Sequence, residues 1–220
     1  AIDGLIDFSR ALEFNKDLPL EQLLINENDF DDLSPLIQTI SKLKAKLTHF
    51  SISGCRITSS IFKQFCKLLL SSNSLSSLVH IGIGGAELTE DAIVDFREYL
   101  KLNRDLISLD LSGSSHFSSL LAALSNAFSS FSSSVRSLNL SGCDFDDSSF
   151  SQLSNIVPFI TELDISNTNL NYYEISDVIS LLGKSCPSSS YLTIKLNRMN
   201  IEKEKSLLVI RGFLSNDLKK

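Results

Sequence analysis

Short stretches in which apolar and polar residues alternate recur along the chain. Residues 137–145 read SLNLSGCDF, residues 108–117 read SLDLSGSSHF, and residues 162–170 read ELDISNTNL. A period of two places the apolar side chains on one face of an extended segment, so each phrase predicts a short strand with one buried face. The segments that follow such phrases have the helical period instead. They predict helices at 59–72, 91–102 and 173–184.

Seven copies of the phrase align on the pattern L-x-x-L-x-L-x-x-N/C-x-L. The copies begin at Leu20, Leu47, Leu78, Leu106, Val135, Ile160 and Tyr191, and successive starts are 27, 31, 28, 29, 25 and 31 residues apart. This pattern and period are typical of leucine-rich repeats of the ribonuclease-inhibitor type. One strand–helix unit cannot bury its apolar face alone, so the units stack. We therefore predict an α/β solenoid, a horseshoe of about seven repeats, with a concave parallel sheet and convex helices.

The repeats divide the chain without a second domain. We expect residues 1–220 to form a single leucine-rich repeat domain, in which 1–19 contain the helix of a preceding repeat, 20–201 hold the seven repeats and 202–220 form a terminal helix. Neither end has an obvious polar cap, so we expect a fragment of a longer solenoid. The serine-rich tract 125–137 is interpreted as the loop into the fifth strand.

Charged residues support this register. Acidic and capping residues gather where helices should begin, and basic residues where they should end, as the helix dipole favours. The first group comprises Asp31, Asp32, Thr89, Glu90, Asp91, Asp146, Asp147, Ser148 and Glu174, and the second comprises Lys42, Lys44, Lys46, Lys101 and Arg104.

Composition narrows the classes of partner. The hydrophobic content is 43%, enough for a sizeable core, and the net charge of −6 argues against nucleic acid or an anionic membrane as the partner of this segment. No apolar run approaches the roughly 18 residues of a membrane span, and no signal peptide is visible. The four cysteines form no CxxC pair. A reducing, cytoplasmic setting fits these features best.

The concave face can be deduced from the strand phrases, and it includes an acidic patch. Asp110, Asn139, Glu162 and Asp164 lie on repeats four to six, where they could dock a basic partner, although Lys195 and Arg198 could neutralise them. His49 and His80 should be neighbours on adjacent strands. Since a zinc site needs three or four ligands, we interpret them as solvent-facing histidines and predict no metal site.

No catalytic constellation is apparent. Cys55 and Cys143 occupy the Asn/Cys position of the repeat, which faces inward, so structural burial is expected rather than nucleophilic chemistry. Residues 82–87, GIGGAE, mimic a dinucleotide loop, but Glu87 stands where the third glycine belongs. No nucleophile, base and orienting group occur together. We predict no enzyme activity and no cofactor.

A second candidate surface is the rim where the helices begin. Asp146, Asp147, Tyr172 and Tyr173 lie there with other acidic residues, namely Glu87, Glu90, Asp91, Asp144 and Glu174. Two interpretations stay open at this point. The acidic residues could serve only as helix caps, or they and the tyrosines could form a ridge that binds a partner protein.

Residues 75–201 resemble the CARMIL family of actin-regulating scaffolds. The resemblance lies in SLVHIGIGG (77–85), SLDLSGSSHFSSLLAALSNAF (108–128), NIVPFITELDISNTNL (155–170) and the insertion at 181–201. It implies a non-enzymatic scaffold of the cell cortex that acts in the regulation of actin filament capping. Actin-regulatory proteins would be its partners, and self-association is possible for a solenoid without caps. The family's membrane-binding, dimerisation and capping-protein-binding regions have no counterpart in these 220 residues.

Three alternatives remain beside this resemblance. They are a tropomodulin-like or generic repeat protein, a GTPase activator of the ribonuclease-inhibitor type, and a leucine-rich repeat domain of the recognition type. A rim arginine or asparagine poised for a nucleotide would favour the GTPase activator.

Overall fold

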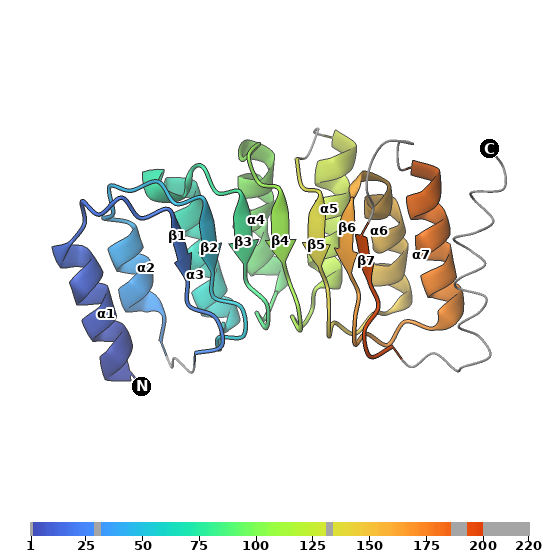
Figure 1. Ribbon diagram of the computed structural model, residues 1–220, viewed down its shortest axis with the longest axis horizontal. Helices are drawn as coiled ribbons and strands as arrows, with labels where there is room; N and C mark the ends of the chain where they lie inside the picture. The colour runs from blue at the N-terminus through green and yellow to red at the C-terminus, as the bar shows by residue number, and fades with distance from the viewer. Residues whose placement is uncertain (1, 29–31, 131–133, 186–192, 200–220) are drawn as a thin grey trace.

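The computed structural model describes residues 2–28, 32–130, 134–185 and 193–199, and it places the strands in one sheet (Figure 1). All neighbouring strands are parallel, and their order along the sheet is their order along the chain. The strands are β1 (Gln22–Leu24), β2 (His49–Ser51), β3 (His80–Gly82), β4 (Ser108–Asp110), β5 (Ser137–Asn139), β6 (Glu162–Asp164) and β7 (Thr193–Lys195).

Helices cover one face of this sheet and leave the other face open (Figure 1). They are α1 (Ile2–Phe14), α2 (Ser34–Ile40), α3 (Ser59–Ser71), α4 (Glu90–Leu102), α5 (Ser118–Ser130), α6 (Asp147–Ile156) and α7 (Tyr172–Ser185), with 3-10 turns η1 (Asn73–Leu75) and η2 (Val157–Phe159). The predicted leucine-rich repeat solenoid of about seven repeats is confirmed. None of the described helices combines the length and apolar character needed to span a bilayer.

The repeated phrase sets the register of the sheet. The central apolar residue of each strand pairs with the central residue of the next, as Leu109 does with Leu138 and Leu138 with Leu163. All three side chains are buried against the helices. Backbone hydrogen bonds continue past the short strands, for example from Ile25 N to Ser51 O at 2.9 Å. Each repeat is therefore bonded to its neighbours beyond the strand itself.

Aromatic side chains fill the core between the sheet and the helices of the second and third repeats. Phe50 of β2 stacks on Phe65 of α3 with ring centroids 5.2 Å apart, and Phe62 contacts Phe96 of α4 at 5.7 Å. All four rings are buried. This layer anchors each helix to the strand that precedes it and to the neighbouring helix.

The predicted inward orientation of Cys55 and Cys143 is confirmed. The Cys55 thiol donates a hydrogen bond to Ile25 O at 3.2 Å, and the Cys143 thiol donates one to Leu111 O at 3.3 Å. Burial raises the pKa of both thiols, that of Cys143 to about 11. Both side chains satisfy a carbonyl of the preceding repeat and stay protonated at neutral pH.

The serine-rich tract was wrongly interpreted as a loop throughout. Residues 125–130 belong to α5, and β5 begins only at Ser137. Leu124, Ala127 and Phe128 are buried at helical spacing, so packing outweighs the low helix propensity of serine here. At the N-terminus, the range 1–19 contains the helix α1, and its assignment to a preceding repeat stays a prediction. The terminal helix expected at 202–220 lies outside the described residues.

The predicted helix ends are only partly as expected. Asp32 and Asp146 accept backbone N–H groups at the starts of α2 and α6, whereas the Thr89 side chain donates to Asp91 rather than capping α4. Lys101 lies in the last turn of α4. Lys42 and Lys44 lie beyond the end of α2. Their ammonium groups form ion pairs with Glu13 at 2.7 Å and Asp17 at 2.6 Å instead.

Gly82 permits a close approach between strands on the concave face. A Cβ at this position would lie 2.0 Å from the Ser51 Oγ and 2.8 Å from the Ser51 Cβ. We expect Gly82→Ala to lower the free energy of unfolding by about 1–3 kcal/mol through overpacking. Urea unfolding followed by circular dichroism measures this change.

Gly4→Ala is the matched control, because nothing lies within 4 Å of the Cβ that it adds to α1. This substitution should raise stability by about 0.5–1 kcal/mol through helix propensity. Equal losses in the two variants would contradict the steric argument.

Candidate functional site

A partly buried polar network occupies the concave face of the first four repeats, with Ser51 and Ser53 buried at its centre. Asn26 Oδ1 accepts hydrogen bonds from the Ser51 hydroxyl at 2.6 Å and from Ser53 N at 3.0 Å. The Ser53 hydroxyl donates to Asp110 Oδ2 at 2.6 Å and accepts from Gly84 N at 3.0 Å. The Asp110 side chain can reach across β3 because glycine at that strand has no side chain to block it. One of its oxygens is therefore bound within the fold.

The last residues of β4, β5 and β6 share a second structural role. Asp110, Asn139 and Asp164 each accept, through Oδ1, the backbone N–H of the serine two positions later at 2.9–3.0 Å. This local bond stabilises the turn that leaves the strand. We did not predict this role, although its sequence signal is simple: an Asp or Asn followed two residues later by Ser.

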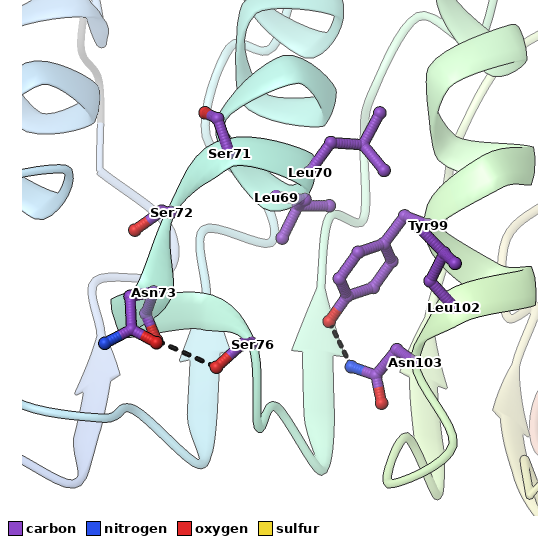
Figure 2. A pocket seen from close by; sticks show the side chains of 9 residues that line it. All are labelled: Leu69, Leu70, Ser71, Ser72, Asn73, Ser76, Tyr99, Leu102 and Asn103. Carbon is purple, nitrogen blue, oxygen red and sulfur yellow. Dashed lines mark hydrogen bonds between the residues drawn. The ribbon is translucent and has the colours of Figure 1, made fainter.

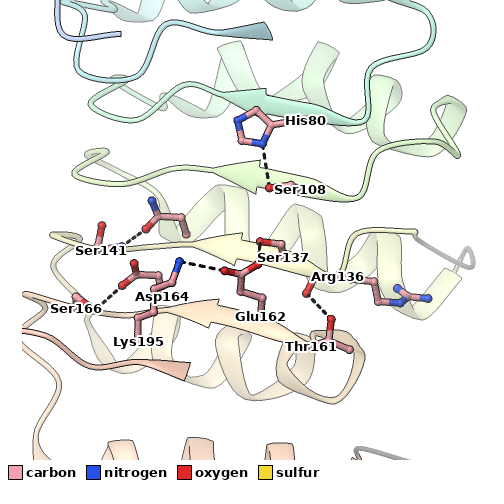
Figure 3. A network of polar contacts seen from close by, with 11 residues as sticks. His80, Ser108, Arg136, Ser137, Ser141, Thr161, Glu162, Asp164, Ser166 and Lys195 are labelled. Carbon is pink, nitrogen blue, oxygen red and sulfur yellow. Dashed lines mark hydrogen bonds and ion pairs between the residues drawn. The ribbon is translucent and has the colours of Figure 1, made fainter. Parts of the chain in front are cut away.

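The predicted acidic patch is assembled, but it is partly neutralised. Asn139 and Asp164 pair in register, and Glu162 lies on the same strand as Asp164. Figure 3 shows the Lys195 ammonium directed at Glu162, 3.0 Å away. The hydrogen bond from Lys195, and then that from the Ser137 hydroxyl, lowers the pKa of Glu162. Lys195 thus has the neutralising role that the sequence suggested.

An open polar hollow adjoins this patch where the strands end. It measures about 540 Å³. Its lining combines one acidic and one basic side chain with amides and hydroxyls, namely Asp164, Arg198, Asn167, Asn197, Ser141 and Ser166, together with Gly142. The structure therefore places Arg198 close to the acidic patch, as expected.

The two concave histidines are neighbours, as predicted. His49 pairs with His80 in the sheet, and their rings stack with centroids 5.8 Å apart. The Nδ1 atoms are hydrogen-bonded to Thr48 Oγ1 and Ser108 Oγ, each at 3.0 Å (Figure 3 shows the bond between His80 and Ser108). Within the described part of the chain, no three His, Cys, Asp or Glu side chains are grouped to hold a metal ion.

Burial, followed by the neighbouring His49 ring, lowers the pKa of His80, while Asp110 opposes both. The charged form of the His80 imidazole is thus disfavoured in the folded protein. Mild acid should therefore destabilise the concave face of the second and third repeats.

The helix-start rim contains both a helix cap and an aromatic pair, of which Tyr173 is exposed. Asp146 and Ser149 form a capping box, with 2.7 Å from Ser149 N to Asp146 Oδ1 and 2.8 Å from Asp146 N to Ser149 Oγ. The bond from Ser149 N lowers the pKa of Asp146. Asp147 is exposed at the first position of α6. Asp146 is therefore a cap, which was one of the two interpretations of the sequence.

Tyr172 and Tyr173 begin α7, which lies beside α6 (Figure 1). Their ring centroids are 3.7 Å apart, and Tyr173 is 66% exposed. Asn171 fixes this turn by accepting the backbone N–H groups of Tyr173 and Glu174 at 2.9 and 3.2 Å. This cap was not predicted from the sequence, although Asn is a favoured capping residue.

An open groove between the ends of α3 and α4 was not predicted either. Figure 2 shows Leu70 and Leu102 at its edges and Tyr99 with Asn103 on one side. The groove measures about 400 Å³. The Asn103 amide donates to the Tyr99 hydroxyl and to Leu78 O, so its polar wall has partners within the fold. The sequence signal that could have predicted this groove is the presence of leucines outside the buried stripe of each helix.

We expect His80→Gln to reduce the acid sensitivity of the fold. Because folding lowers the pKa of His80, the unfolded chain binds the proton more readily than the folded chain. The contribution of His80 to the free energy of unfolding should have its full value above the unfolded pKa of 6.5. It should fall as the pH drops through that value. Urea unfolding at about pH 7.5 and about pH 5.5 compares the two proteins.

His116→Gln, at an exposed position outside the histidine pair, is the control for this experiment. It should keep the wild-type difference between the two pH values. If His80→Gln kept that difference as well, the acid sensitivity would arise elsewhere.

Asp146→Ala should lower the free energy of unfolding by about 1 kcal/mol, because the first turn of α6 loses its capping box. Asp147→Ala, one residue later, should cost less because its contribution comes from the helix dipole alone. Guanidinium unfolding of both variants checks the difference. Similar losses would argue against the cap as the main role of Asp146.

The leucine-rich repeat family model matches residues 46–68 and 134–156. No curated protein matches the sequence. Among solved structures, leiomodin-1 actin-binding site 2 is 14% identical with a TM-score of 0.42, covering 82% of this chain and 88% of that chain. The tropomodulin C-terminal domain of Caenorhabditis elegans is 12% identical with a TM-score of 0.35, covering 97% and 94%. The two segments matched by the family model, each with a strand and the helix after it, are thus leucine-rich repeats.

Proposed function

We propose that this chain is a non-enzymatic scaffold for protein–protein interaction. The observation that carries the proposal is the tyrosine pair at the start of α7, in which the exposed Tyr173 ring lies against the half-buried Tyr172, next to the acidic start of α6. Tyrosine is enriched at the centres of protein interfaces because it combines a large apolar ring with a polar end. A curved solenoid supplies a rigid support for such a surface.

The chemistry of the described residues favours binding over catalysis. The Cys55, Cys66 and Cys143 thiols are buried, and burial raises the pKa of each. A thiolate nucleophile is therefore disfavoured at all three positions. The carboxylates of Asp110 and Glu162 are bound by neighbouring groups of the fold. Neither resembles a general base held ready for a substrate.

Charge defines the kind of partner. Asp147 lies in the first turn of α6 and Glu174 in the first turn of α7, and the whole chain has a net charge of −6. Such a surface attracts a basic protein and speeds its association, and salt screens the attraction. We therefore infer that the rim binds a basic surface, with the tyrosines as its apolar anchors.

The cellular setting follows from the resemblance of residues 75–201 to the CARMIL repeats. On this basis we infer that the chain acts in the cytoplasm at the cell cortex, with actin-regulatory proteins as partners. Direct contact with capping protein would depend on segments that these 220 residues do not include.

The test is capture of actin-regulatory proteins by the immobilised chain. Tyr172→Ala/Tyr173→Ala should reduce the amount captured by about tenfold, which corresponds to one interface anchor of about 1.4 kcal/mol. Quantitative mass spectrometry measures the captured proteins, and added salt should weaken capture. The melting temperature should change little, because Tyr173 is exposed.

Val94→Ala removes an exposed apolar side chain from α4 and is the matched control. It should retain the wild-type set of captured proteins. The proposal fails if the tyrosine variant captures the same actin regulators in the same amounts, or if the wild-type chain captures none.

A further inference from the structure

The groove between the ends of α3 and α4, which we call the leucine groove, has no part in the proposed function. Its lining is uncharged, and Figure 2 shows Leu70 and Leu102 at its edges. These side chains are 40% and 72% exposed. α5 has the same length as α3 and α4 but ends in Ser129 and Ser130, so the repeat does not require leucine there. Exposed leucines around an open groove mark a candidate interaction surface.

The leucine groove also offers hydrogen-bond acceptors. The last carbonyl groups of a helix have no partner within the helix itself. Ser72 N binds the Leu68 carbonyl near the end of α3 at 2.8 Å. The carbonyls of Leu69, Leu70 and Ser71 come after it in the chain, and these residues line the groove. A side chain that combines an apolar ring with a hydrogen-bond donor suits such a groove, and tyrosine has both.

Basic side chains lie beside the leucine groove. Lys67 is exposed one turn before Leu70 on α3. Lys46 is exposed as well, and the N–H of the next residue, Leu47, binds Ser74 O at 2.8 Å. This bond places Lys46 beside the η1 turn that lines the groove. Residues 98–105, at the end of α4, contain two acidic and two basic side chains and are balanced in charge. The groove therefore favours an acidic occupant over a basic one.

The chain itself has a surface of the matching kind, which we call the tyrosine ridge. The ridge comprises Tyr172, Tyr173, Glu174 and Asp177 at the beginning of α7. Tyr173 is 66% exposed, and Asp177 is exposed one turn later on the same face of the helix. Asp147, exposed in the first turn of α6, adds a further negative charge to this side of the solenoid. The ridge thus combines an exposed aromatic ring with carboxylates.

The ridge and the groove lie on opposite rims of the solenoid. All strands are parallel, so each helix runs back from the rim where its strand ends to the rim where the next strand begins. α7 begins on the first of these rims, whereas α3 and α4 end on the second (Figure 1). The ridge therefore cannot reach the groove of its own chain. Only a second molecule can bring the two surfaces together.

We propose that the leucine groove binds the tyrosine ridge of a second copy of this chain. The Tyr173 ring would enter the groove between Leu70 and Leu102, and the carboxylates of the ridge would face Lys46 and Lys67. The inference rests on the proposed function, because it uses the ridge as an anchor for a basic surface. It adds that the chain supplies one such surface itself.

This contact is heterologous, because the two surfaces that meet are different. In a pair of copies, one groove and one ridge stay unused, and each can bind a further copy. Such a contact produces rings or open filaments and does not close at a dimer with two equal halves. The proposal therefore predicts association that continues beyond two chains.

Sedimentation velocity from about 1 μM to about 1 mM protein measures this association. The average mass should rise with concentration beyond that of two chains, and added salt should lower it. Leu102→Glu places a carboxylate in the groove, and Tyr173→Lys places an ammonium group on the ridge. Each substitution should raise the dissociation constant at least about tenfold. Both positions are exposed, and circular dichroism checks that the variants are folded.

Val94→Glu is the matched control, because it adds the same charge at another exposed apolar position of α4, outside the groove. This variant should associate like the wild-type chain. An equal loss in Val94→Glu and Leu102→Glu would overturn the proposal, since the effect would then come from charge alone.

A mixture of the two interface variants tests the pairing of the surfaces directly. The Leu102→Glu chain retains an intact ridge, and the Tyr173→Lys chain retains an intact groove. An equimolar mixture should therefore form dimers with one chain of each kind, with the wild-type affinity, and should grow no further. Native mass spectrometry identifies the mixed dimers because the two chains differ in mass.

Three further outcomes would overturn the proposal. They are a wild-type chain that stays monomeric over the whole concentration range, a mixture that forms no mixed dimers, and wild-type association that stops at two chains. The last would indicate an interface between two identical surfaces instead.

Capture of actin-regulatory proteins separates this inference from the proposed function. Leu102→Glu should lose self-association but capture these proteins in the wild-type amount, because its ridge is intact. A wild-type chain that stays monomeric and captures them through Tyr172 and Tyr173 would overturn this inference alone. A chain that self-associates but captures none would overturn the proposed function alone.

Discussion

Each strand of the sheet is only three residues long, and its place is set by one central apolar residue stacked in register on those of its neighbours. A slip of one residue would turn the apolar position toward solvent and the polar positions toward the helices. Buried positions before and after the central apolar residue extend this constraint into the turns. The arrangement of every concave and rim side chain follows from that register, because each strand brings the same repeat position to the same place on the surface.

The same regularity explains why the concave face offers few free polar groups. Equivalent positions on neighbouring strands lie opposite one another, so side chains of matching chemistry meet and satisfy each other, as Glu162 and Lys195 do. Ser53 and Asp110 do so over a longer distance. The surfaces that remain for a partner are the places where the repetition is broken. Tyr173, in the first turn of α7, is such a place, because it is an exposed aromatic residue.

Much of this fold was predictable from sequence, and the reasons are specific. The leucine positions at Leu109, Leu138 and Leu163 define both the strands and their register, because a period of two fixes a buried face. The serine tract misled because its buried Ala127 and Phe128 were outnumbered by serines of low helix propensity.

The candidate sites were less predictable. The sequence placed Asp110 on the concave face, but its bond to Ser53 joins residues 57 positions apart across a glycine strand, which no local pattern reveals. Local periodicity therefore predicted the helices and strands. The hydrogen bonding and the exposure of individual side chains could be known only from the tertiary structure.

The bond between Ser53 and Asp110 also bears on how the solenoid unfolds. Repeat proteins behave approximately as one-dimensional chains in which each unit is coupled only to the next, so their ends can fray one unit at a time. Here a side chain of the fourth repeat reaches the second and thereby couples units that are not neighbours. The first four repeats are consequently joined into a single cooperative block, from which the remaining repeats can open in succession.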